Sequence, residues 1–479
     1  MNSLRKLAGE TAIYGLGTIL PRLFNFLLVP LHTAVFYPEA YGVITYLYAF
    51  VAFINVVYMW GMETAYFRFA TKPGADARQV FNLAQTVVLS ISLLLSLLII
   101  AFKFPIASYV NLAGKEHYIT WLAGVMFIDA LVAIPFAQLR LQKKSIRFAT
   151  AKITSVLLLV FLNYYFLYQA NTPVEVGYVF LANLLGNAVL VLFFMRTLWE
   201  WRPSYDRTIT PAMFRYAYPV MLTGVAGMVN EMFSRITLEW WLPENFYPGK
   251  PAAYALGVFG ACYKYAVFMN LAVQSFRFAA EPFFFSHAQD KKSPELFAKV
   301  NHYFVIVAST ILLAVSINLD ILKYILGDEQ YWSGLTVVPV LLLAYLFLGV
   351  YYNLSVWFKL TDRTQYGTLF SVGGAAVTIL ANYLLIPVWG YVGSSLAALL
   401  CYTSMTVACY WFGQKHFPIP YPIGKSLFYI LFALALIYFS ARFTVENQWL
   451  ALLFHNSLVL GYFGLIYFLE RPTLPQPPK

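Results

Sequence analysis

The fold is decided by two similar stretches, AYGVITYLYAFVAFIN starting at Ala40 and ALGVFGACYKYAVFMN starting at Ala255, about 215 residues further along. Both stretches are apolar enough to cross a bilayer. Identical residues recur in them as the pairs Ala40 and Ala255, Gly42 and Gly257, Val43 and Val258, Phe53 and Phe268, and Asn55 and Asn270. Weak internal repeats are typical of transporters whose halves move about a central site. The repeat therefore predicts a duplicated membrane bundle, with its function between the halves.

The composition indicates an integral membrane protein. Hydrophobic residues make up 61% of the chain and charged residues only 11%, against about 25% charged in a typical soluble domain. Segments such as VVLSISLLLSLLII from Val87 show no alternation of polar and apolar residues, which favours helices over strands. We expect an all-α protein with about fourteen transmembrane helices. They begin near residues 11, 40, 79, 118, 148, 174, 211, 253, 297, 333, 367, 391, 424 and 448.

Lys and Arg in the short loops predict the orientation, because these residues collect on the cytoplasmic side. With the N-terminus inside, roughly 23 of them fall in cytoplasmic segments and about five in the opposite loops. Both termini are thus expected in the cytoplasm, and the net charge of +11 reads as orientation signal rather than a nucleic-acid surface. The first span has no cleavage site after a short apolar region, so a removable signal peptide is not expected.

The repeat also predicts the domain organisation. An even number of spans precedes the second copy, so both copies enter the membrane in the same direction. We expect an N-terminal lobe at 1–205, a C-terminal lobe at 206–415, two additional helices at 416–470 and a disordered tail at 471–479, which is Pro-rich.

Several classes of activity lack their sequence signals. No predicted loop exceeds about 20 residues, which leaves no room for an extramembrane catalytic domain, and the zinc-protease, P-loop and nucleophile-elbow motifs are missing from the sequence. Cysteines and histidines show no metal-ligand spacing. We expect no enzyme activity, no cofactor and no bound metal.

Charges inside apolar spans are the candidate functional residues, since a charge at the bilayer centre costs at least about 2.5–3.5 kcal/mol. Arg22, Asp129 and Lys264 all reach about mid-depth in their spans, which suggests a polar cavity there. Lys264 is the sharpest case, because its repeat partner is Ala49 and symmetry would predict a small residue. Structural ion pairs are the alternative for such charges, although a buried pair usually stabilises less than apolar packing.

Further charges lie above and below this level. Glu231, Arg235 and Glu239 follow each other at i, i+4 and i+8, which predicts a paired ladder on one helix face. On the cytoplasmic side Glu63 and Arg277 lie near the ends of their spans, where interfacial snorkelling is an equal alternative to a function.

The stretches TAIYGLGTILPRLFNFLLVPLHTAVF, AYGVITY, FKLTDRTQYG and NYLLIPVWGYVGSSLAALLCY resemble the polysaccharide-exporter branch of the multidrug/oligosaccharidyl-lipid/polysaccharide superfamily, especially Wzx-type flippases. The resemblance covers essentially the whole chain. It implies two six-helix lobes around a central cavity, two further helices, and export of an undecaprenyl-pyrophosphate-linked oligosaccharide from the cytoplasmic to the periplasmic leaflet of a bacterial inner membrane. A glycan polymerase and glycosyltransferases are the implied partners.

The resemblance and the buried charges together suggest site roles. Family cavities carry basic residues on the leading helices, which Arg22 and Lys264 match, and Arg can meet a pyrophosphate bidentately. The expected substrate-binding residues are Arg22, Lys264, Arg235 and Arg277, and the expected ion-coupling residues are Asp129, Glu231 and Glu63. Two alternatives remain: a multidrug or organic-cation antiporter of the same fold, which should favour acids at mid-depth, and a lipid-sugar polymerase, which should carry a catalytic loop.

Overall fold

The computed structural model describes residues 17, 19–169, 174–288, 292–443 and 447–471, and every regular element in these ranges is a helix. The predicted tail at 471–479 lies outside them except for its first residue. By its internal contacts the chain forms two compact units. Unit 1 comprises Met1–Ala261, Gly327–Tyr331 and Ser371–Ser394, and unit 2 comprises Cys262–Leu326, Trp332–Phe370 and Ser395–Lys479. The lobe boundary at residue 205 was inferred from the repeat and stays a prediction.

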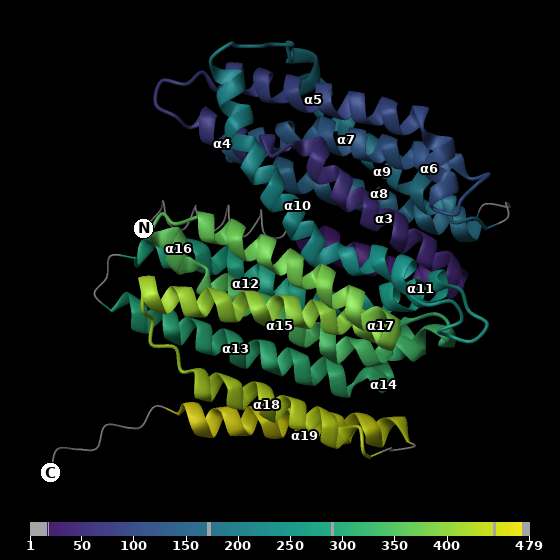
Figure 1. The fold of residues 1–479 in the computed structure, drawn as a ribbon, viewed down its shortest axis with the longest axis vertical. Helices are drawn as coiled ribbons and strands as arrows, with labels where there is room; N and C mark the ends of the chain where they lie inside the picture. Colours follow the sequence, from purple (N-terminus) through teal and green to yellow (C-terminus); the bar gives the residue numbers. More distant parts are fainter. Residues whose placement is uncertain (1–16, 18, 170–173, 289–291, 444–446, 472–479) are drawn as a thin grey trace. The chain divides into compact units, whose positions relative to one another are not determined.

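Unit 1 is a helical bundle in which α7 packs against both α5 and α9, α8 against α9, and α3 against α10 (Figure 1). An apolar helix at Ile19–Val35, of which α2 is the last part, leads the unit. The helices are α2 (Leu28–Val35), α3 (Pro38–Met59), α4 (Met62–Ala70), α5 (Ala77–Ala101), α6 (Lys103–Tyr109), α7 (Glu116–Leu141), α8 (Ser145–Tyr164), the π-helical η1 (Tyr165–Gln169), α9 (Gly177–Glu200), α10 (Ile209–Trp241) and α11 (Ala252–Tyr263), whose last two residues fall in unit 2.

Unit 2 is built around α13, which packs against α12, α15, α18 and α19. Its helices are α12 (Ala266–Ser286), α13 (Ser293–Ile317), α14 (Leu319–Leu322), the 3-10 helix η2 (Lys323–Ile325), most of the 3-10 helix η3 (Glu329–Thr336), α15 (Val337–Leu354), α16 (Val356–Leu360), the two ends of α17 (Gln365–His416), α18 (Ile423–Ser440) and α19 (Gln448–Glu470).

Within unit 2, a buried polar contact joins α18 and α19 to α13. His302 of α13 is 5% exposed, and its Nε2 lies 3.0 Å from Glu470 Oε1 at the end of α19. The Tyr429 hydroxyl of α18 donates to the same carboxylate oxygen at 2.9 Å. Three helices therefore share one carboxylate, and an apolar cluster that includes Leu313, Ala433 and Tyr462 continues the packing.

Local sequence explains where several helices begin and end. Pro38 occupies the first turn of α3, where its missing N–H costs nothing. Trp60 and Gly61 both have positive φ, +48° and +67°, and this left-handed pair separates α3 from α4. The side chain of Asp76 accepts a hydrogen bond from the Arg78 N–H and caps α5. The first copy of the repeat therefore lies in one long helix, α3, that ends at a defined break.

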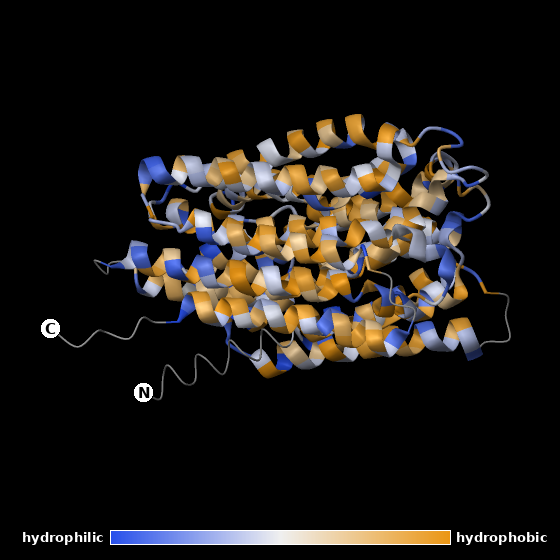
Figure 2. Ribbon diagram, turned by 90° about the horizontal axis from the view of Figure 1, so that it is seen from below, coloured by the Kyte–Doolittle hydropathy of each residue, from blue (hydrophilic) through white to orange (hydrophobic). Residues whose placement is uncertain are grey.

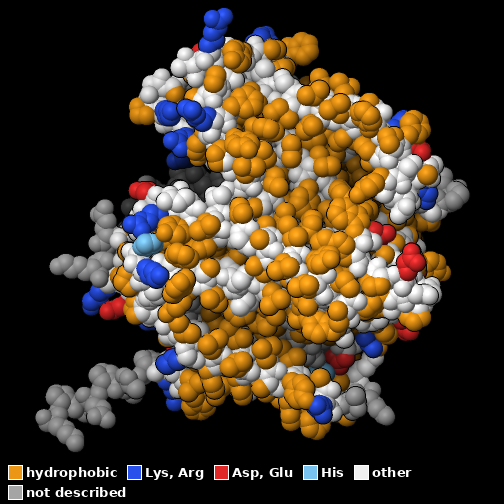
Figure 3. Space-filling view, in the orientation of Figure 1, with side chains coloured by type: hydrophobic (Ala, Val, Ile, Leu, Met, Phe, Trp, Pro, Cys, Tyr) orange, Lys and Arg blue, Asp and Glu red, His pale blue; other side chains and the backbone are white. Residues whose placement is uncertain are grey.

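The described helices confirm a multi-pass membrane protein. Ten of them are long and apolar enough to cross a bilayer, or eleven if the broken pair α11 and α12 counts as one span. Large apolar side chains point outward along them: Leu94 and Leu97 of α5 are 59% and 57% exposed. Hydrophobic side chains cover much of the visible helix surface (Figure 3), and hydrophilic residues gather toward helix ends and loops (Figure 2). Such a surface suits lipid rather than water.

The count of fourteen spans is not confirmed. The expected start near residue 11 lies outside the described residues, and each of the other expected starts falls close to a described helix or its flank. The 52-residue α17 counts once, yet Gly390 inside it has φ +57° and breaks the helical geometry. Polar residues such as Asn230 and Glu231 lower the hydropathy of the 33-residue α10. The first apolar helix is described only as the short Ile19–Val35.

The repeated glycines meet face to face within unit 1. A Cβ on Gly42 would lie 2.0 Å from the Ala253 carbonyl oxygen, and one on Gly257 would lie 1.8 Å from the Pro38 carbonyl oxygen. Both distances are far shorter than any van der Waals contact. Only glycine lets α3 and α11 approach this closely, so the two copies of the repeat supply matching halves of one crossing.

Candidate functional site

Asp129 lies midway along α7 in the core of unit 1. The Asn187 side chain of α9 donates a hydrogen bond to its Oδ1 at 2.9 Å, and the Asn55 side chain of α3 also hydrogen-bonds to the carboxylate. The other polar atom of that amide, Asn55 Oδ1, is buried and has no hydrogen-bond partner in the described part of the chain. An acid and an unpartnered carbonyl oxygen thus lie together, which is a suitable setting for a proton or a small cation.

A second acid lies on the same side of the bundle. Glu63 Oε1 of α4 is 2.6 Å from Arg140 Nη2 at the end of α7. Lys152 of α8 interacts electrostatically with both Asp129 and Glu63, and its Nζ lies 4.3 Å from the Phe136 ring centroid. We call Asp129, Lys152, Glu63 and Arg140 the charged cluster. Two acids and two bases balance one another, so binding or release of one cation would leave a net charge in a largely apolar surrounding.

Helical spacing explains how the sequence brings these groups together. Asp129, Phe136 and Arg140 are 7 and 4 residues apart and therefore share one face of α7. Lys152 and Ser155 share a face of α8 in the same way, and the Ser155 hydroxyl donates to the Gly186 carbonyl at 3.0 Å. The polar residues of α7 and α8 point into one bundle because apolar residues occupy the other faces.

The α9 helix contributes a third polar face to this bundle. Asn183 and Asn187 are one turn apart, and the Asn183 side chain donates to the Tyr48 hydroxyl of α3 at 2.8 Å. The hydrogen-bonded side chains of α3, α7, α8 and α9 therefore form one connected polar layer inside unit 1.

Two of the predicted ion-coupling residues, Asp129 and Glu63, therefore lie in one network. Lys152, Arg140 and Asn187 were not among the candidate site residues predicted from the sequence. Lys152 stands seven residues into α8, a depth from which a lysine side chain can reach either the interface or the bundle interior, so its position alone does not distinguish the two.

The three α10 residues that were predicted to form a paired ladder, Glu231, Arg235 and Glu239, lie in different surroundings. Arg235 hydrogen-bonds to the Met232 sulfur one turn earlier. Glu239 Oε2 is buried and has no hydrogen-bond partner within the described ranges. Glu231 is half-buried on the same helix. The proposed ion role of Glu231 and the substrate role of Arg235 both stay predictions.

The remaining predicted substrate residues lie in three settings. Arg22 is exposed on the Ile19–Val35 helix. Lys264 is half-buried in the turn that separates α11 from α12, whereas its repeat partner Ala49 is 1% exposed inside the unbroken α3. Arg277 of α12 lies 3.7 Å from Glu281 and stacks 4.9 Å from the Tyr352 ring centroid. Their joint role as a substrate site stays a prediction.

The arrangement as a whole defines a class of protein. The described residues form a multi-pass helical membrane protein with a charged cluster inside one unit, and they share this fold with solved flippases and MATE transporters. The chain belongs to the family described as polysaccharide biosynthesis protein, whose model matches residues 35–292.

Solved structures show the same fold. The inward closed conformation of the lipid II flippase MurJ has a TM-score of 0.72 and 14% sequence identity, covering 95% of this chain and 99% of that one. An inward-facing multidrug resistance MATE family transporter has a TM-score of 0.66 and 16% identity, covering 82% and 94%. A Vibrio cholerae MATE transporter has a TM-score of 0.60 and 15% identity, covering 86% and 96%. Comparison with curated protein sequences finds no significant match.

Proposed function

We propose that this protein is a flippase that moves an undecaprenyl-pyrophosphate-linked oligosaccharide, such as an O-antigen, capsule or exopolysaccharide unit, from the cytoplasmic to the periplasmic leaflet. The observation that carries the proposal is membership of the polysaccharide biosynthesis family in a chain with the full-length fold of a lipid II flippase. The protein would lie in the bacterial inner membrane with both termini in the cytoplasm, and a glycan polymerase and glycosyltransferases would act beside it.

The proposed mechanism is alternating access between two lobes. Arg22 and Lys264 would attract the pyrophosphate, with Arg235 and Arg277 as further cationic contacts, while the lipid tail stays in the bilayer. A desolvated pyrophosphate needs such cations because charge-assisted hydrogen bonds replace its lost water. No covalent step is required.

Return to the loading state would draw on an ion gradient through the charged cluster. Asp129 is the best-supported coupling group, because its hydrogen-bond donors hold the carboxylate in place while Lys152 offers a countercharge. Protonation or cation binding at Asp129 would release Lys152 to Glu63 and so change the packing of α7 against α8. Glu63 is the second candidate for this role, and Glu231 is the third.

The test is depletion of the protein in cells that assemble a surface glycan. A flippase predicts accumulation of lipid-linked units facing the cytoplasm, and complementation should fail for Arg22→Ala and Lys264→Ala. Lys103→Ala and Arg442→Ala, which remove charges from the opposite loops, serve as matched controls and should complement. Normal glycan assembly by both Arg22→Ala and Lys264→Ala would overturn the proposed substrate site.

The multidrug antiporter is the second candidate, and the MATE fold of several solved neighbours favours it. It predicts lost resistance to organic cations on depletion, with no change in lipid-linked sugars. A lipid-sugar polymerase predicts accumulation of single units on the periplasmic face instead. The same depletion experiment therefore separates all three functions.

A further inference from the structure

A second polar site lies at one end of unit 1, apart from the charged cluster. It is a cavity of about 570 Å³ between the ends of four helices: the start of α5, the end of α7, the start of α8 and the end of α9. Four cations line it, and Glu200 is the one acid among the lining residues. The cations are Arg78, Lys144, Arg147 and Arg196. We call it the basic cavity.

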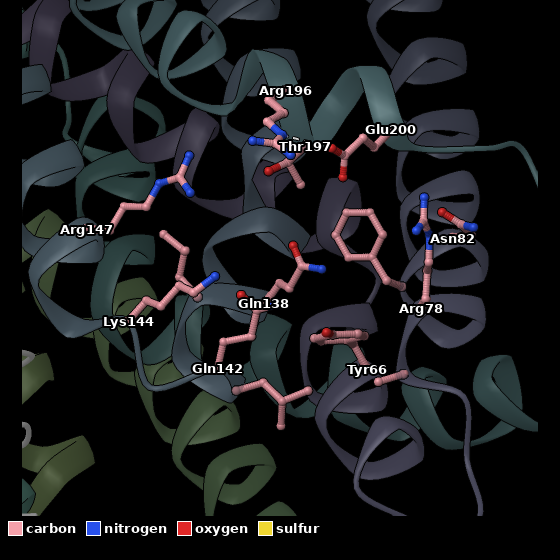
Figure 4. A pocket seen from close by; sticks show the side chains of 14 residues that line it. Tyr66, Arg78, Asn82, Gln138, Gln142, Lys144, Arg147, Arg196, Thr197 and Glu200 are labelled. Carbon is pink, nitrogen blue, oxygen red and sulfur yellow. Dashed lines mark hydrogen bonds and ion pairs between the residues drawn. The ribbon is translucent and has the colours of Figure 1, made fainter.

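The cations surround the cavity from opposite sides. Figure 4 shows Lys144 and Arg147 on one side, Arg78 with Asn82 on the other, and Arg196 between them. Arg196 Nε lies 2.9 Å from Glu200 Oε1, so this pair neutralises itself and leaves three cations around the space. Like charges gathered around one hollow repel each other unless an anion lies between them.

Polar groups in the wall of the cavity are also available to a ligand. The side-chain amide of Gln138 and the hydroxyl of Thr197 are half-buried, and neither has a hydrogen-bond partner among the described residues. Figure 4 places the Gln138 amide in the middle of the ring of cations. Tyr66, which is 1% exposed, closes the wall. Both groups can form hydrogen bonds, so the wall offers neutral polar contacts beside the cations.

The surroundings of the basic cavity indicate where that occupant comes from. All four lining helices span the membrane, and the cavity lies at the ends that the Lys and Arg distribution predicts to be cytoplasmic. Apolar side chains beside it point outward: Ile146 is 71% exposed and Trp199 is 81% exposed. Exposed Trp at a helix end is typical of the headgroup level of a bilayer. The cations of the cavity and the outward-pointing apolar side chains therefore both lie near the expected headgroup level of the cytoplasmic leaflet.

We propose that the basic cavity binds the phosphate-bearing headgroup of an anionic phospholipid from the cytoplasmic leaflet, with the acyl chains lying along α8 and α9. Basic pockets between transmembrane helices on this side suit such headgroups. Arg147 and Arg78 would meet phosphate oxygens from opposite sides, and Gln138 would donate to an oxygen between them. The site is independent of the proposed transport cycle and lies within one unit.

Native mass spectrometry of the full-length protein with cardiolipin, phosphatidylglycerol and phosphatidylethanolamine tests the proposal. The variant Lys144→Gln/Arg147→Gln should retain anionic lipid about 25-fold more weakly, since each Lys or Arg near anionic lipid contributes about a factor of five. The control Arg207→Gln/Lys299→Gln removes one Arg and one Lys from exposed positions outside the cavity. It should bind as the wild type does.

The arms of this experiment separate the sources of phosphate. Preferential retention of the two anionic lipids, lost only in the cavity variant, supports the proposal. Equal loss in the control variant would mean general surface charge, and would overturn it. Tight binding of inorganic phosphate by the wild type, with no preference for anionic over zwitterionic lipid, would assign the cavity to a free anion and would likewise overturn it. Intact folding of each variant is read from the same spectra as the lipid-free mass and charge-state distribution.

Discussion

The two halves of the repeat keep the same contacts at the helix ends and differ in the middle. Glu63 and Arg140 pair at 2.6 Å in unit 1, and Glu281 and Lys359 pair at 2.6 Å in unit 2. These residues stand 218 and 219 positions apart along the chain, so each pair links the end of the second span to the end of the fourth in its own half. The pair at the helix ends is therefore part of the duplicated scaffold.

Asp129 corresponds to a region of uncharged residues in unit 2. A shift of 218 residues places Asp129 opposite Phe347, and a shift of 219 places Asn187 opposite Thr406. The contact persists with different chemistry, because the Thr406 hydroxyl donates to the Phe347 backbone carbonyl at 2.8 Å, where Asn187 donates to a carboxylate. Lys152 likewise corresponds to Phe370, which is 4% exposed. Asp129 and Lys152 of unit 1 thus have uncharged counterparts at the corresponding positions of unit 2, and this asymmetry is the strongest argument that the charged cluster has a function.

The largest expected effect comes from filling the glycine crossing that joins the two copies. Gly42→Ala or Gly257→Ala places a methyl group within 2.0 Å of a backbone oxygen, so the helices must separate. We expect a loss of stability of about 3 kcal/mol, the upper part of the range for overpacking. Thermal unfolding in detergent, followed by size-exclusion chromatography, measures it.

Gly227→Ala in α10 is the matched control, since nothing lies within 4 Å of its added Cβ. Alanine is the better helix former, so this variant should be as stable as the wild type or slightly more stable. If Gly42→Ala unfolds at the same temperature as Gly227→Ala, the close crossing of the two copies is wrong.

A smaller effect should distinguish two asparagines that stand at matching positions. Asn163 and Asn382 are both fully buried, and each donates to the carbonyl four residues before it, at 2.9 Å and 2.8 Å. Asn163 Oδ1 also lies 2.8 Å from His32 Nε2, whereas Asn382 Oδ1 has no hydrogen-bond partner in the described ranges. Asn163→Ala should therefore cost about 2 kcal/mol, because it also removes a partner of a buried histidine, and Asn382→Ala about 1 kcal/mol. Equal unfolding temperatures would show that the His32 contact contributes nothing.

Removing the charge of Asp129, which has no charged counterpart at the corresponding position of unit 2, should affect transport more than folding. Asp129→Asn keeps an oxygen that accepts from Asn187 but cannot be ionised, so the coupling step is lost. We expect transport in reconstituted vesicles to slow at least tenfold, about 1.4 kcal/mol, with little change in unfolding temperature. Thr406→Val, which removes the corresponding hydrogen bond of unit 2, should leave transport near the wild-type rate. Comparable slowing in both variants would mean that Asp129 acts through packing alone.

Sequence alone predicted the membrane-helical class and the family, because long apolar segments and a repeated pattern depend on composition and spacing. It also picked out Asp129, since a charge at mid-span is costly enough to signal a role. It could not find Lys152, because a lysine near a helix start looks the same whether its chain snorkels outward or turns into the bundle. The partners of Asp129 come from helices that are separated by up to about 75 residues in the chain, and no local pattern encodes that meeting.

The smallest effect is expected from the two ion pairs at the helix ends, Glu63 with Arg140 and Glu281 with Lys359. Both pairs are about one-third exposed, with side-chain exposures of 35% and 40% for Arg140 and Glu63 and of 28% and 40% for Lys359 and Glu281. Each should therefore contribute about 1 kcal/mol or less. The two pairs still differ, because Glu281 also lies 3.7 Å from Arg277, whereas Glu63 has Lys152 as its further partner. Double-mutant cycles with Glu63→Gln and Arg140→Gln, and with Glu281→Gln and Lys359→Gln, measure both coupling energies by thermal unfolding. Similar values would support a common scaffold, and a coupling found only in unit 1 would mean that its pair contributes to the charged cluster rather than to a scaffold shared by both halves.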